Sequence, residues 1–152
     1  MERARAELKM KPAAAGYSGT PLWKKLGLKP GSWFLVSNPP EQFDQLLSGA
    51  PRDLDRLSRL APFDIALAFV VSGRSLTAML SRLEAKLPPA GMIWIAWPKR
   101  TSGVVTDLTE DVVRSSALAL GLVDVKVCAI DATWSGLKLI RRLRDRDTAR
   151  RE

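Results

Sequence analysis

The stretch "WPKRTSGVVTDL" holds several of the side chains whose types and spacing could do chemistry. Lys99 and Arg100 are adjacent, and such a pair of cations can hold a carboxylate or a phosphate. Asp107 follows in the same segment and could orient a partner group or a magnesium ion. Each has a plainer alternative. The two cations could form a solvated loop edge, and Asp107 has capping-box spacing to Glu110 at the start of a predicted helix.

Further polar candidates follow two other apolar segments. Asn38 comes after "SWFLVS", while Ser72 and Arg74 come after "IALAFVV". The carboxyl ends of parallel strands meet at one edge of an open α/β sheet, and such sheets bind ligands there. The sequence therefore predicts a crevice with seven ligand-binding candidates: Asn38, Ser72, Arg74, Trp97, Lys99, Arg100 and Asp107.

The residue types that the chain lacks exclude several kinds of chemistry. Its 152 residues contain no histidine and one cysteine, Cys128. Without histidine there is no Ser-His or Cys-His nucleophile pair and almost no transition-metal site, so we predict no metal. A lone cysteine makes no intrachain disulfide, which favours a reducing cytoplasm. The longest apolar run, residues 65–71, is far shorter than the roughly 20 residues of a membrane span.

The formal charge of +8 is concentrated at the two ends of the chain. Residues 138–152 contain seven Lys/Arg and three Asp/Glu, or +4, and residues 1–11 contain four and two, or +2. Basic ends can bind nucleic acid. Because the tail "RLRDRDTARRE" mixes both signs, we favour a solvated tail over a nucleic-acid interface.

The elements that must position these residues alternate between strands and helices. Apolar runs predict three buried strands, and helical spacing with turn residues predicts the helices between them. An alternating segment and its successor predict a final antiparallel hairpin. The strands are expected at 32–37, 63–72 and 91–97, the helices at 20–28, 41–49, 74–89 and 106–122, and the hairpin at 123–131 and 136–143.

Segment 53–60 is ambiguous between a helical turn and an edge strand. Only a few residues separate Leu60 from the strand near Asp64. A parallel crossover needs about a dozen residues. The segment is therefore either no strand, or a strand that is not paired in the ordinary right-handed βαβ manner.

Several of these stretches resemble a known class of fold. "LGLKPGSWFLV", "LPPAGMIWIAW" and "LALGLVDVKVC…WSGLKLIRR" are similar to parts of class I S-adenosylmethionine (SAM)-dependent methyltransferases. The resemblance implies a small, truncated methyltransferase-like Rossmannoid α/β sheet, mostly parallel, with a C-terminal antiparallel β-hairpin. A helix and a strand of the full fold are missing from the middle.

Longer motifs resemble a narrower family. "GYSGTPLWKKLG", "WPKRTSGVVTDLTEDVVR" and "GLVDVKVCAIDATWSGLKL" are similar to the bacterial family called domain of unknown function 3052 (DUF3052). That resemblance spans about residues 16–141 and implies the same fold without implying an activity.

The segment "VSNPPE" differs from the cofactor loop that the methyltransferase resemblance implies. That loop is rich in glycine, whereas Pro39 and Pro40 here lack N–H donors. Glu41 is expected in the first turn of the next helix, where its charge would satisfy the helix end. After the second strand, Ser58 and Arg59 replace the usual acidic residue. We therefore expect no cofactor, with SAM and NAD both disfavoured.

Three functions are compatible with these residues. The first, which we favour, is a non-catalytic binding or interaction module that contacts a small anionic ligand or a protein. The second is an enzyme of unassigned chemistry that uses Lys99 and Asp107. The third is a nucleic-acid-associated protein that uses its basic ends. We expect a flexible basic arm over 1–15, one α/β domain over 16–142 and a charged tail over 143–152, with no membrane association.

Overall fold

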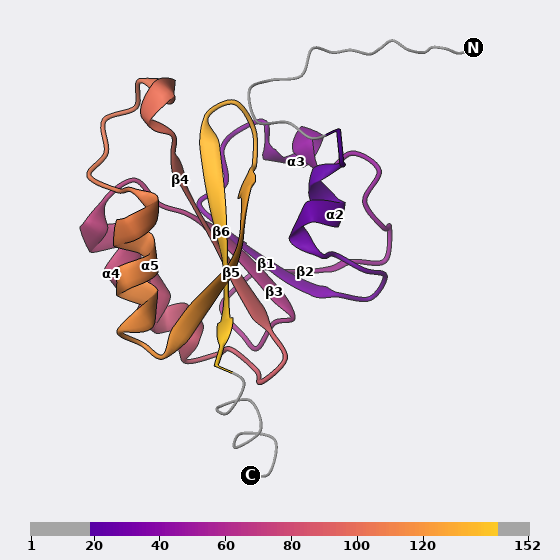
Figure 1. Cartoon of the computed structure of the whole chain (residues 1–152). Helices are drawn as coiled ribbons and strands as arrows, with labels where there is room; N and C mark the ends of the chain where they lie inside the picture. The colour runs from indigo at the N-terminus through magenta and orange to yellow at the C-terminus, as the bar shows by residue number, and fades with distance from the viewer. Residues whose placement is uncertain (1–18, 143–152) are drawn as a thin grey trace.

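Residues 19–142 are described by a computed structural model, and they form one six-stranded sheet with helices on both faces (Figure 1). The strand order is β2-β1-β3-β4-β6-β5. β1 to β4 run parallel, β6 is antiparallel to β4, and β5 is antiparallel to β6. The predicted class of fold is thereby confirmed. The strands are β1 (Trp33–Ser37), β2 (Asp55–Leu57), β3 (Ile65–Phe69), β4 (Met92–Pro98), β5 (Leu122–Ala129) and β6 (Trp134–Arg141).

The helices are short, apart from the two that cover one face of the sheet. They are α2 (Leu22–Leu26), α3 (Phe43–Leu46), α4 (Gly73–Glu84), the single 3-10 turn η1 (Arg100–Ser102) and α5 (Glu110–Leu118). No helix among residues 19–142 is long and apolar enough to cross a membrane. The predicted arm 1–15 and tail 143–152 lie outside the described residues, so the domain boundaries stay a prediction.

The sheet separates two hydrophobic cores, because alternate side chains of the central strands point to opposite faces. α4 and α5 cover one face and α2 and α3 the other (Figure 1). Trp94 is fully buried on the α2 side, and its indole N–H donates to the Leu26 carbonyl at 3.1 Å. That bond attaches the end of α2 to the centre of the sheet.

The ambiguous segment 53–60 contains an edge strand. β2 pairs in parallel with β1, with Leu57 opposite Leu35. The chain then reaches β3 on the other side of β1 through residues 58–64 alone. Leu60 and Phe63 of this connection pack on the α4 side of the sheet. Because β2 is only three residues long, the seven residues 58–64 are enough to return to the start of β3 and pass β1.

The final hairpin turns tightly at residues 130–133. Asp131 is nearly buried, and its Oδ1 accepts hydrogen bonds from the Thr133 and Trp134 N–H groups, each at 2.8 Å. β6 then pairs with β4 along its length, so that Ser135 lies opposite Trp97. The hairpin thus brings its turn beside the carboxyl end of β4.

Candidate functional site

The predicted candidates leave the sheet at the carboxyl ends of three parallel strands. Asn38 follows β1, Ser72 and Arg74 follow β3, and Lys99 and Arg100 follow β4. In Figure 1 the carboxyl end of β4 lies at the top of the sheet, next to the β5–β6 turn. The topology therefore places the candidates along one edge, as an α/β sheet requires.

The backbone of Asn38 shows that the turn after β1 does not need a glycine. Its φ of 54° makes it the one non-glycine residue of positive φ among residues 19–142. Asparagine tolerates this left-handed conformation better than most residues, because its short polar side chain makes local hydrogen bonds. The turn after β1 therefore has the backbone geometry that a glycine would supply.

The segment after Asn38 also begins its helix later than predicted. α3 starts at Phe43 with Gln42 as N-cap, so Glu41 lies before the helix and not in its first turn. The Phe43 N–H donates to the Pro40 carbonyl at 3.0 Å. Pro40 disfavours a helical conformation at Pro39, so the helix does not begin there. The expectation that Glu41 neutralises a helix end is wrong.

Asp107 does not cap α5 as its spacing to Glu110 predicted. The N-cap of α5 is Thr109, whose Oγ1 accepts from the Val112 N–H at 3.2 Å. Asp107 instead accepts from the Gly73 N–H at 2.9 Å, at the N-terminus of α4. Its partner lies 34 residues away in the sequence, so local spacing could not reveal it.

Ser72 caps the same end of α4. Its hydroxyl accepts from the Ser75 N–H at 3.1 Å as the N-cap of α4. The carboxyl end of β3 therefore has two polar side chains, Ser72 and Asp107, that serve the first turn of α4. Arg74 is exposed in that turn.

Four of the seven candidates line one hollow of about 700 Å³ between the end of β4 and the segment 99–109. They are Trp97, Lys99, Arg100 and Asp107. Asn38, Ser72 and Arg74 do not line it. Its other walls include Val104, Thr106, Leu108, Glu110 and Ser135, which the sequence analysis did not select. Ser135 could not be found from spacing, because the β4–β6 pairing brings it opposite Trp97.

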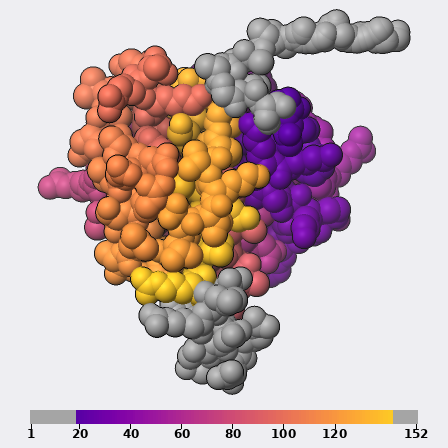
Figure 2. Space-filling view, viewed as in Figure 1, coloured from indigo at the N-terminus to yellow at the C-terminus, as the bar shows by residue number. Residues whose placement is uncertain are grey.

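The segment 99–109 is fixed at several points, although it is a long loop. The Lys99 N–H donates to the Thr133 carbonyl at 2.7 Å, which attaches its start to the hairpin turn. The Thr106 hydroxyl donates to the Val71 carbonyl at 2.6 Å, which attaches its end to the β3–α4 connection. In Figure 2 this segment forms a ridge at the upper left, next to the hairpin. The hollow is therefore built into the fold.

A second, smaller hollow of about 230 Å³ lies at the carboxyl ends of β1 and β2. Ser37, Ser58 and Arg59 contribute to its lining, together with Arg82 of α4. Ser58 and Arg59 were expected only to stand in place of an acidic residue. β2 ends opposite Leu35, two residues before the end of β1, so the next two residues, Ser58 and Arg59, reach the candidate edge.

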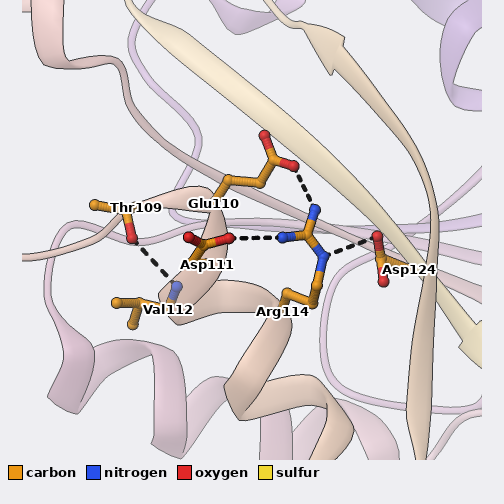
Figure 3. Close-up of polar contacts among 6 residues, drawn as sticks. All are labelled: Thr109, Glu110, Asp111, Val112, Arg114 and Asp124. Carbon is orange, nitrogen blue, oxygen red and sulfur yellow. Dashed lines mark hydrogen bonds and ion pairs between the residues drawn. The ribbon is translucent and has the colours of Figure 1, made fainter.

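Arg114 organises the acidic residues beside the larger hollow (Figure 3). Its guanidinium donates to Glu110, to Asp111 at 2.8 Å and to Asp124 at 3.0 Å. The hydrogen bonds to Glu110 and Asp124 raise the pKa of Arg114 above its ordinary value. The network joins the start of α5 to β5 and engages the Glu110 carboxylate.

Two further groups in the hairpin have shifted acidities. Burial raises the pKa of the Cys128 thiol above its ordinary value of 9.0, so the thiol is protonated at neutral pH. Burial and the nearby charge of Lys126 lower the pKa of Lys138. Within residues 19–142, no group of three or more His, Cys, Asp or Glu side chains could hold a metal ion.

Comparison with known proteins identifies the class of fold. A candidate methyltransferase from Thermoplasma acidophilum matches with a TM-score of 0.52 and 11% identity, over 82% of this chain and 75% of that one. Magnesium protoporphyrin IX methyltransferase (ChlM) from Synechocystis PCC 6803 with bound SAM matches with a TM-score of 0.53 and 11% identity, over 80% and 74%. LepI in complex with SAM matches with a TM-score of 0.52 and 10% identity, over 88% of this chain and 49% of LepI.

These similarities establish a Rossmann-like fold of the class I SAM-dependent methyltransferase type. No family model matches the chain, and no curated protein is significantly similar in sequence. Membership of the DUF3052 family therefore stays a prediction.

The expectation of no cofactor, with SAM disfavoured, is overturned by the same comparisons. ChlM holds SAM in one structure and S-adenosylhomocysteine (SAH) in another, and LepI holds SAM. Chains of this fold thus accept the ligand that the local argument excluded. One step of that argument was wrong, because it required glycine for a left-handed turn that Asn38 also adopts.

Proposed function

We propose that this chain binds an S-adenosyl ligand, SAM or SAH, at the carboxyl ends of β1, β2 and β3. The observation that carries the proposal is the shared fold with ChlM and LepI, whose structures contain these ligands. In an open α/β sheet this edge is where ligands bind.

The residues at this edge fit such a ligand. Asn38 turns the chain after β1 in the left-handed conformation. The hydroxyls of Ser37 and Ser58 line the smaller hollow and would hold the sugar hydroxyls of an adenosyl group. Arg59 lines the same hollow and would pair with the α-carboxylate that SAM and SAH both carry. When bound, SAM would supply an activated methyl group.

The proposal concerns binding, and two uses of the bound ligand follow from it. One is a non-catalytic binding module, as the sequence analysis favoured, and the other is methyl transfer to an acceptor. The DUF3052 resemblance of "WPKRTSGVVTDLTEDVVR" belongs to the proposal as well and favours neither use. Release of SAH from SAM in the presence of candidate acceptors separates the two uses.

Calorimetric titration of the full chain with SAM and with SAH tests the binding. We expect saturable binding of at least one of them, and Ser58→Trp, which fills the smaller hollow, should weaken it at least about tenfold. Ser115→Trp on exposed α5 is the matched control and should leave the dissociation constant unchanged. No saturable heat with either ligand, or equal loss in both variants, would contradict the proposal.

A further inference from the structure

The larger hollow, between β4 and the segment 99–109, combines an apolar floor with open positive charge. Trp97 is 5% exposed and Leu108 is 4% exposed, and both belong to the core under α4 and α5. Val104 and Val105 leave 42% and 94% of their surface exposed in the same lining. A volume of about 700 Å³ falls in the range of small-molecule pockets, roughly 300–1,000 Å³.

The two carboxylates of this lining already have donors. Glu110 accepts from the Arg114 guanidinium. Asp107 accepts from the Gly73 N–H at the N-terminus of α4, where the helix dipole stabilises negative charge. The charge of Glu110 is therefore balanced by Arg114, and the charge of Asp107 is stabilised by the end of α4.

Arg100 is in the opposite situation. Among the described residues, no hydrogen bond or ion pair engages its guanidinium, although it lines the hollow next to Lys99. A guanidinium presents a planar set of donors that matches a carboxylate or a phosphate with two parallel hydrogen bonds. Arg100 is thus the group in this lining that can pair with the carboxylate or phosphate of a ligand.

The walls need no rearrangement to receive a ligand. Segment 99–109 is attached to the hairpin turn through Lys99 and to the end of β3 through Thr106, and Ser102 closes it internally by donating to the Lys99 carbonyl at 2.7 Å. Pre-formed walls lower the entropic cost of binding.

We propose that this hollow is a binding site for a small organic anion with an aromatic or similarly flat apolar body. The apolar body packs against the exposed Val104 and Val105, next to Trp97 and Leu108, and the carboxylate or phosphate pairs with Arg100. Anion binding stands independently of the proposed function. The further role of the bound anion as the acceptor of a methyl group rests on that function.

A series of ligands that share one ring and differ in charge tests the site. Benzoate, phenyl phosphate, benzyl alcohol and benzylamine are titrated into the full-length protein, and the indole N–H signal of Trp97 is followed by NMR after assignment with Trp97→Phe. We expect benzoate or phenyl phosphate to bind about fivefold or more tightly than benzyl alcohol, with benzylamine weakest. The relative affinity of the two anions distinguishes a carboxylate ligand from a phosphate ligand.

Two arginine variants locate the effect. Arg100→Gln should abolish the preference for the anions, whereas Arg52→Gln, a matched exposed arginine that lines neither hollow, should keep it. Equal affinity for benzyl alcohol, tighter binding of benzylamine, or equal loss in both variants would overturn the proposal. SAH is titrated into the same samples to distinguish the two proposals. Failure to bind SAH would contradict the proposed function and would leave the anion site untouched.

Discussion

At the scale of single residues, the backbone of Asn38 decides how the turn after β1 is understood. Asparagine there adopts φ 54°, a conformation in which a β-branched side chain is strained. We expect Asn38→Val to be about 1–2 kcal/mol less stable than Asn38→Gly in urea unfolding. The difference arises because glycine pays no steric cost at positive φ.

The comparison at Asn38 has an internal control at Gln42. Gln42 is exposed at φ −89°, where valine and glycine are both allowed. There the glycine variant should be no more stable than the valine variant. Equal stability of the two Asn38 variants would show that the turn is not left-handed.

The residue scale also shows what spacing could and could not reveal. Lys99 and Arg100 were found from their adjacency, and the structure places them together with Asp107 in one hollow. Arg114 has Glu110 and Asp111 at local helical spacing, but its contact with Asp124 of β5 could not be found from spacing. Polar networks between elements depend on tertiary pairing, which one sequence does not display.

At the scale of elements, Asp107 connects the end of the β4–α5 segment to the start of α4. Its carboxylate accepts the Gly73 N–H, one of the unpaired donors of a helix N-terminus. We expect Asp107→Ala to lower the free energy of unfolding by about 1 kcal/mol, as for the loss of a helix cap. Asp107→Asn should lose less, because the amide oxygen still accepts the bond.

A second exposed aspartate provides the control for this measurement. Asp111 leaves 91% of its side chain exposed and contacts only Arg114. Asp111→Ala should change stability by no more than about 0.5 kcal/mol. If the two alanine variants lose the same free energy in urea unfolding, Asp107 does not stabilise α4.

Most elements were predictable because their signals are local. The apolar runs of β3 and β4 and the helical spacing of Leu76, Met79 and Leu83 gave the correct elements, and these residues are buried as expected. The predicted starts of α3 and α5 were a few residues too early. In α5, Thr109 competed with Asp107 for the cap, and the distant partner of Asp107 decided between them.

At the scale of the whole molecule, the sheet has a methyltransferase-like fold with polar side chains at the carboxyl ends of its parallel strands. The seven-residue connection 58–64 replaces an element-length crossover and carries Ser58 and Arg59 to that edge. The two hollows lie at the ends of different strands, β1 and β2 for one and β4 for the other. In the two proposals made above, the smaller hollow would hold an S-adenosyl compound and the larger one an organic anion.

The two alternative functions depend on different parts of the chain. The enzyme hypothesis based on Lys99 and Asp107 stays a prediction, with both residues in one hollow. The nucleic-acid hypothesis concerns the charged ends, which lie mostly outside residues 19–142.

A crystal structure of the full chain grown with SAH tests the central claim most directly. We predict electron density for the adenosyl group at the carboxyl ends of β1 and β2, in contact with Asn38 and Ser58, with the fold otherwise unchanged. Density for SAH elsewhere on the surface would contradict it. So would well-resolved strand ends with no SAH density at a saturating concentration of SAH.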